Sequence, residues 1–144
     1  MNAIVVYATI TGNNEAVADI IIDQLKSHDV MVTKSEISQT EVEDLQNQDI
    51  AVVVPYTYDN GSLPDEGLDF YDDLEFVDLS GTKYGVAGSG DLFYEDDYCV
   101  AVDKFDTALS NAKANKAAQN VKINLIPDKT DEAKLKKFVN DLLA

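Results

Sequence analysis

The stretch AIVVYATITGNNEAVADIIIDQLKSHDVMVTKS, residues 3–35, determines the expected fold. It opens with a β-branched apolar run at 3–8, which is typical of a buried strand. Apolar residues then recur at helical spacing and predict a helix over 13–27. These residues are Val17, Ile20, Ile21 and Leu25. A second apolar run at 30–35 completes a strand–helix–strand unit with parallel strands and a right-handed crossover.

The same alternation of strands and helices continues to the end of the chain. Further strands are predicted at 49–55, 83–89 and 121–126. The predicted helices are 65–77 (apolar face Leu68, Tyr71 and Leu74), 98–114 (Val102, Phe105 and Leu109) and 131–143 (Leu135, Phe138, Val139 and Leu142, capped by Thr130), with a weaker helix at 40–47. Five strands alternating with helices indicate an α/β fold, a doubly wound five-stranded parallel sheet with helices on both faces.

Composition narrows the class of protein. With 144 residues we expect one domain spanning 1–144, and no apolar run approaches the length of a membrane span. A net charge of −16 without any arginine argues against binding to nucleic acid or an anionic membrane. The single cysteine, Cys99, rules out an internal disulfide framework, so we expect a cytoplasmic protein. The sequence contains no cluster of His and Cys residues, so no metal site is expected.

Acidic residues are concentrated in one part of the chain. Between Asp59 and Asp106 there are 14 carboxylates and two lysines, Lys83 and Lys104. Such a field steers basic protein partners toward a surface, so basic partners are expected to dock on the acidic face 59–106. A contribution to solubility alone is the alternative interpretation.

Ligands of doubly wound sheets bind beyond the carboxyl ends of the strands, which directs attention to three loops. The first loop gathers small donors before a helix: Thr9, Thr11, Gly12, Asn13 and Asn14. A helix N-terminus holds a phosphate without any cationic side chain, although ordinary N-capping would select the same residue types. The loop matches neither the P-loop pattern nor GxGxxG.

The other two loops carry aromatic residues. In PYTYDNGSLPDE (55–66), Tyr56 and Tyr58 flank Thr57. In GSGDLFYEDDYC (88–99), two glycines and an acidic residue precede Tyr94 and Tyr98. Each loop alone is also explained by core packing or an ordinary turn. Together they describe a phosphate cradle with an aromatic on each side of a flat ring, which favours flavin mononucleotide (FMN).

At this point the sequence resembles the flavodoxins. TITGNNE resembles their phosphate loop T-x-T-G-x-T-E, and TYDNGSLPDEGLDFYDDL and GSGDLFYEDDYCVAVDKF resemble their second and third flavin loops. No insertion interrupts the last strand, so the chain is similar to the short-chain group. The resemblance implies a sheet of order 2-1-3-4-5, non-covalent FMN, and single-electron transfer between a reductase and acceptor enzymes by a protein that is not itself an enzyme and is expected to be a monomer.

The resemblance also assigns residues to the cofactor. Those implied at the phosphate are Thr9, Ile10, Thr11, Gly12, Asn13 and Asn14. Those implied around the ring are Tyr58 on one face, Tyr94 on the other, and Ser89, Gly90, Asp91 and backbone near Cys99 at the pyrimidine edge. From the second loop, Tyr56, Thr57, Asp59 and Asn60 are further candidate contacts.

Departures from the family pattern keep some assignments open. Asn14 replaces the usual Thr; its amide can still donate to the phosphate, so weaker or reshaped binding is expected and not its loss. Asp59 stands where the family usually has Gly. Glycine adopts a positive φ at little cost, whereas the Cβ of Asp59 disfavours that backbone conformation. Tyr98 is an alternative to Tyr94 as the aromatic residue on the outer face of the flavin, because the spacing between Tyr94 and Cys99 is one residue longer than is common in the family. Without arginine near the ring, a low potential is expected. The alternative function is a dedicated role of an FMN-binding protein of the same fold, such as activation of ribonucleotide reductase. The sequence lacks the residues that a receiver domain needs, and those that a hydrolase using Cys99 or His28 would need.

Overall fold

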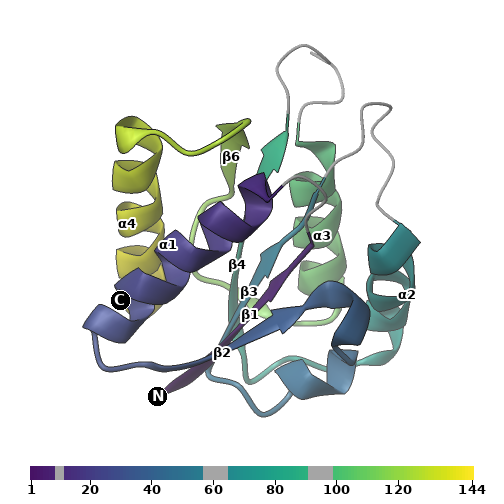
Figure 1. Ribbon diagram of the computed structural model, residues 1–144. Coiled ribbons are helices and arrows are strands. Elements are labelled where there is room, and N and C mark those ends of the chain that lie inside the picture. Colours follow the sequence, from purple (N-terminus) through teal and green to yellow (C-terminus); the bar gives the residue numbers. More distant parts are fainter. Residues whose placement is uncertain (9–11, 57–64, 91–98) are drawn as a thin grey trace.

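A parallel sheet forms the centre of the computed structural model, which describes residues 1–8, 12–56, 65–90 and 99–144 (Figure 1). The strands are β1 (Asn2–Tyr7), β2 (Met31–Glu36), β3 (Ile50–Val54), β4 (Lys83–Gly90), β5 (Asn115–Lys116) and β6 (Val121–Asn124). Their order is β2-β1-β3-β4-β5, and β6 also pairs with β4. Because β5 and β6 pair with successive parts of the same edge of β4, they share the fifth position and the predicted order 2-1-3-4-5 is confirmed.

Helices cover both faces of the sheet, as predicted (Figure 1). The α-helices are α1 (Asn13–Ser27), α2 (Asp65–Asp73), α3 (Val100–Asn111) and α4 (Lys129–Leu143). Side chains alternate along a strand, so β1 divides its residues between the two faces. Ala3 and Val5 pack with α1 and α4, whereas Ile4 and Val6 pack with α2 and α3. None of the helices in the described ranges is long and apolar enough to cross a bilayer.

The fifth strand position differs from the prediction of one strand at 121–126. The first segment, β5, was not predicted, and the second ends at Asn124 because Leu125 adopts a left-handed conformation (φ 58°). Between the two segments, Ala118 is buried against the α1 and α4 side, and Asn120 donates to the carboxylate of Asp106. These two side chains thus make their contacts outside the strand ladder, between β5 and β6.

The helix predicted at 65–77 was too long, and its apolar face was partly wrong. A 3₁₀ turn, η3 (Leu74–Phe76), follows α2 and ends the helical segment. Leu68 is 40% exposed, whereas Phe70 is buried together with Leu74. The weak helix at 40–47 is likewise a 3₁₀ turn, η2 (Val42–Leu45), preceded by η1 (Ile37–Gln39).

The predicted cap of the last helix was also wrong. The N-cap of α4 is Asp128, and Thr130 lies inside the first turn. Asp128 accepts a hydrogen bond from the backbone N–H of Asp131 (2.9 Å), and the Asp131 carboxylate accepts one from the N–H of Asp128 (3.1 Å). This reciprocal capping box satisfies two donors at once, so it prevails over a single threonine hydroxyl.

A partly buried carboxylate, Asp106, connects α3 to the fifth strand position. It accepts hydrogen bonds from the Tyr84 hydroxyl (2.5 Å), Lys116 Nζ (2.9 Å) and Asn120 Nδ2 (3.0 Å). Burial alone would raise the pKa of Asp106, but these three hydrogen bonds outweigh burial and lower the pKa below its usual value. The same burial, together with Asp106, raises the pKa of Tyr84.

Acidification is expected to weaken the fold through this carboxylate. Because the folded-state pKa of Asp106 is lowered, its stabilisation is complete above about pH 4 and is lost as the pH falls through the folded-state value. In Asp106→Asn, the free energy of unfolding in urea should therefore fall less steeply between about pH 4 and pH 2 than in the wild type. The pH dependence of the free energy of unfolding in Tyr84→Phe, which removes one of the three donors to Asp106, should lie between those of the wild type and Asp106→Asn. Identical slopes in all three proteins would contradict this assignment.

Candidate cofactor site

The described residues that flank the three predicted loops meet at the carboxyl edge of the sheet (Figure 1). The N–H of Ala8, after β1, donates to the carbonyl of Val54 in β3 (3.0 Å). Tyr56, after β3, forms an isolated bridge with Ser89 in β4. Of the predicted contacts, the structure describes Gly12, Asn13, Asn14, Tyr56, Ser89, Gly90 and Cys99. Thr9, Ile10, Thr11, Thr57, Tyr58, Asp59, Asn60, Asp91 and Tyr94 lie outside the described residues, as does Tyr98.

Gly12 begins α1 in a conformation that suits glycine. Its φ is +92°, a left-handed value that side chains disfavour, and a Cβ built on it would meet no atom of the described residues within 4 Å. Glycine is therefore favoured here by the backbone angle and not by a close contact with the described part of the chain. The backbone N–H groups in the first turn of a helix suit a phosphate group, so the start of α1 is a fitting place for one.

The Asn14 side chain is directed into the protein and not toward a ligand. It is fully buried, and its amide nitrogen donates to the carbonyl oxygens of Ala8 (2.6 Å) and Val54 (3.2 Å). Its carbonyl oxygen accepts from the N–H (2.8 Å) and the hydroxyl (2.7 Å) of Ser89. The sequence predicted an amide that donates to the phosphate. In the structure both amide hydrogens are used by main-chain carbonyls, because three strand ends converge on this position.

The segment Gly88-Ser89-Gly90 alternates between the two faces of β4. A Cβ on Gly90 would lie 2.9 Å from the Cys99 sulfur, so this glycine allows α3 to start against the strand. Ser89 is buried and its hydroxyl lies on the opposite side, bonded to Asn14. The Cys99 thiol is fully buried and lies 3.6 Å from the Gly88 carbonyl oxygen, so this side chain packs inside the protein.

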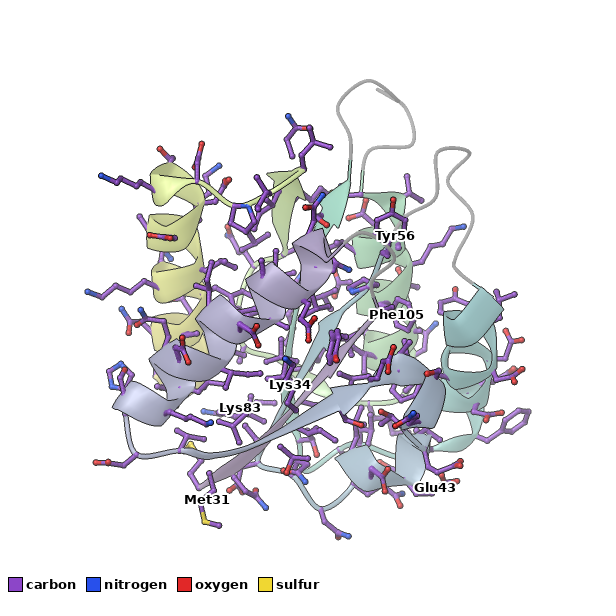
Figure 2. The ribbon with its side chains drawn as sticks, viewed as in Figure 1. Met31, Lys34, Glu43, Tyr56, Lys83 and Phe105 are labelled. Carbon is purple, nitrogen blue, oxygen red and sulfur yellow. The ribbon has the colours of Figure 1, made fainter. Side chains whose placement is uncertain are left out.

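Tyr56 belongs to the core as well as to the site edge. Its side chain is partly buried and packs against the cluster under α2 and α3. Figure 2 shows it at the carboxyl edge, while Met31 lies at the opposite end of the sheet. The packing interpretation therefore accounts for its ring, and its backbone bridge to Ser89 aligns the exits of β3 and β4.

Comparison with known proteins identifies the family. Residues 5–138 match the family model described as flavodoxin. The chain belongs to the flavodoxin family. It is 35% identical over 130 residues to probable flavodoxin 1 of Bacillus subtilis, and the aligned residues cover 90% of this chain and 81% of the Bacillus protein.

Solved flavodoxin structures agree closely with this fold. A short-chain flavodoxin associated with a PDU bacterial microcompartment is 54% identical, with a TM-score of 0.97 over 99% of this chain and 97% of that one. A flavodoxin of Streptococcus pneumoniae is 41% identical, with a TM-score of 0.96 over 99% and 98%. As a short-chain flavodoxin, this chain is an electron-transfer protein with FMN as its cofactor, and not an enzyme.

Lys34 is a charged residue beside the first turns of α1 that the sequence analysis did not consider. Its Nζ lies 2.8 Å from Glu15 Oε2 and 2.9 Å from Asp19 Oδ1, between β2 and α1 (Figure 2). It also lies 5.2 Å from the centre of the Tyr7 ring. The hydrogen bonds that Lys34 donates to Glu15 and Asp19 raise the pKa of Lys34. Only the pairing of β1 with β2, which sets Lys34 beside Val5, brings this lysine to the start of α1.

Removing the Lys34 charge is expected to weaken FMN binding selectively. Glu15 in the first turn of α1 and nearby Asp19 would then repel the phosphate without compensation. At about 12 Å and an effective dielectric of about 40, one unit of charge changes the energy of a phosphate dianion by about 1.4 kcal/mol. Lys34→Gln should therefore weaken FMN about tenfold at low salt, and less at high salt.

Two controls accompany this measurement, which uses fluorescence titration of the apoprotein. Riboflavin lacks the phosphate, so its affinity should be unchanged in Lys34→Gln. Lys26→Gln, at the other end of α1, should leave both affinities unchanged. An equal loss for riboflavin and FMN would contradict an electrostatic origin.

Proposed function

We propose that this flavodoxin carries single electrons at low potential from a reductase to acceptor proteins, with FMN bound non-covalently at the carboxyl edge of the sheet. Bound FMN supplies the redox-active ring, and the protein sets its energetics. The observation that carries this proposal is the convergence of the flanks of all three predicted loops on one edge, beside the start of α1 at Gly12.

The proposed contacts follow the sequence, with one change from the structure. Asn14 would meet the phosphate through its backbone N–H, since its amide is used internally. The other proposed phosphate contacts are Thr9, Ile10, Thr11, Gly12 and Asn13. The proposed ring contacts are Tyr58 and Tyr94 on the two faces, with Tyr56, Thr57, Asp59, Asn60, Ser89, Gly90, Asp91 and the backbone near Cys99 around the edge.

The charge of the protein supports a low potential. Lys34 is offset by two carboxylates, and Lys83 lies at the far end of β4, where it donates to the carbonyl of Ala144 (3.0 Å). One carboxylate about 12 Å from the ring, at an effective dielectric of about 40, raises the energy of an added electron by about 0.7 kcal/mol. This corresponds to about 30 mV for one electron. Several such carboxylates would keep the second reduction well below that of free FMN.

The structure narrows the acidic surface that we propose for docking. Asp103 and Asp106, at one end of the acidic segment, are paired with Lys122 (2.6 Å) and Lys116 (2.9 Å). In contrast, Asp69, Asp72, Asp73 and Glu75 are exposed and form no ion pair with any described residue. Leu68 and Phe76 are exposed beside them. We therefore place the docking surface for basic partners on α2 and η3.

Charge neutralisation tests this surface. The triple variant Asp69→Asn/Asp72→Asn/Asp73→Asn should reduce the second-order rate of electron transfer to cytochrome c, a basic acceptor, by about tenfold at low salt. The difference should largely disappear at about 0.5 M salt. The matched control, Asp23→Asn/Asp29→Asn/Glu132→Gln, makes the same change in net charge in and after α1 and in α4, which pack on the other face of the sheet from α2, and should have little effect. Equal losses in the two variants would rule out a specific surface.

Spectroelectrochemical titration tests the low potential itself. We expect two one-electron steps, with the second clearly below that of free FMN. A second step at or above the value of free FMN would contradict the proposed role as a low-potential donor.

A further inference from the structure

Asn14 is the only described polar side chain that links all three strand ends flanking the predicted loops. Ala8 directly precedes the first loop, Val54 ends β3, and Ser89 lies near the end of β4. In the sheet, β3 separates β1 from β4. The Asn14 side chain therefore connects strands that do not touch through the backbone ladder, from a position in the first turn of α1.

The hydrogen bonds of this side chain use its full capacity. A primary amide offers two N–H donors and one carbonyl oxygen that accepts two hydrogen bonds. Asn14 donates to two carbonyl oxygens and accepts from the N–H and the hydroxyl of Ser89, at 2.6 to 3.2 Å. The side chain is fully buried, so water does not replace any of these partners.

Other side chains do not reproduce this pattern. Threonine, the usual residue at this position of the motif, has one donor and is shorter. Aspartate would turn a carboxylate toward two carbonyl oxygens, which repel it. Alanine would leave buried polar groups of Ala8, Val54 and Ser89 without partners, which is unfavourable.

We infer that Asn14 is a positioning residue that fixes the phosphate loop and the ring loop relative to each other, so that binding at one end of the cofactor site promotes binding at the other. This inference rests on the proposed cofactor site. Asn14 acts through Ala8 and Ser89, which directly precede the proposed phosphate contacts at Thr9 and the proposed ring contacts at Gly90. Loss of the side chain should therefore weaken both ends of the site together, although its amide contacts neither.

The test measures the two ends separately. Apoprotein is titrated with inorganic phosphate, with riboflavin, with riboflavin in saturating phosphate, and with FMN, at a temperature at which circular dichroism shows each variant folded. In the wild type, phosphate should tighten riboflavin binding. In Asn14→Ala, phosphate and riboflavin should each bind several-fold more weakly, phosphate should no longer tighten riboflavin, and FMN should weaken by about tenfold or more.

The chain offers a matched control in Asn2. Its amide also joins separate segments, donating to the carbonyl of Asn47 (3.2 Å) and accepting from the N–H of Asp49 (2.9 Å), but at the amino edge of the sheet. Asn2→Ala should lower thermal stability and leave the affinities unchanged. If Asn14→Ala does the same, its role is only structural and the inference is overturned. A loss confined to phosphate also overturns it, because Asn14 would then be a direct ligand.

A second variant keeps the inference testable if Asn14→Ala does not fold. Ser89→Ala removes one of the four hydrogen bonds and retains the Ser89 N–H. It should weaken riboflavin and phosphate by about threefold each, in line with the loss of one modest hydrogen bond. Unchanged affinities for both ligands would overturn the inference. A wild-type protein that does not bind FMN would instead remove the proposed site itself.

Discussion

Replacing Phe138 with alanine is expected to lower the free energy of unfolding by about 3–5 kcal/mol. Phe138 lies in α4 and is almost fully buried in the cluster that α1 and α4 form with the sheet. Its removal would leave a cavity that neighbouring strands cannot fill by relaxing. Since a domain of this size is stable by only about 5–15 kcal/mol, urea denaturation should show a large decrease in the midpoint without a change in slope.

Gly85 makes this prediction more specific, because its lack of a side chain is what admits the ring. A Cβ on Gly85 would lie 2.6 Å from Phe138 Cζ and 3.1 Å from Leu142 Cδ2. Gly85→Ala alone should therefore destabilise by about 1–3 kcal/mol through overpacking. In the double variant Gly85→Ala/Phe138→Ala, the added methyl group would occupy the cavity left by the ring. The double variant should therefore be more stable than the sum of the two single effects predicts. Strict additivity would show that the two positions do not share this packing site.

The fold was predictable because its signals are local and repeated. The apolar faces of α1, α3 and α4 follow the predicted spacing, with Phe105 and Leu135 as buried examples. The apolar face predicted for 65–77 was correct only in part: Tyr71 and Leu74 pack in the core, but Phe70 is buried where Leu68 was predicted, because helical spacing alone did not decide between these two residues. The short β5 also escaped detection, because two residues that are polar and exposed carry no strand pattern.

The candidate site was predictable as a set of loops but not as a set of contacts. The residue types of the first loop indicate a phosphate, and the fold rule places the loops at one edge. The sequence could not show that the Asn14 amide turns inward, because its partners Val54 and Ser89 lie 40 and 75 residues away. Lys34 was missed for the same reason, as it pairs with Glu15, 19 positions distant.

Gly88→Ala is expected to have the largest combined effect on stability and cofactor binding. A Cβ on Gly88 would lie 2.6 Å from the backbone oxygen of Pro55 and 2.9 Å from Val102 Cγ2. Pro55 follows β3 and Val102 lies in the first turn of α3, so either the exit of β3 or the start of α3 must move. We expect destabilisation of about 3 kcal/mol in urea and, because both proposed ring loops adjoin these segments, a loss of FMN affinity of about tenfold or more.

Gly81→Ala is the matched control for this substitution. A Cβ on Gly81 would meet no atom of the described part of the chain within 4 Å, and its φ is not positive. The variant should therefore change the free energy of unfolding by less than about 0.5 kcal/mol and leave FMN binding unchanged. Comparable losses in the two alanine variants would mean that the general cost of replacing glycine, and not the contact with Pro55, is responsible.

The double variant Gly88→Ala/Val102→Ala separates the two contacts of the added methyl group. Truncating Val102 removes the side-chain contact but leaves the backbone oxygen of Pro55 in place. Because a backbone oxygen at the end of a buried strand moves less readily than a side-chain methyl, the double variant should remain as weak in FMN binding as Gly88→Ala. Recovery of wild-type affinity in the double variant would show that Val102, and hence the start of α3, sets the geometry of the ring end of the site.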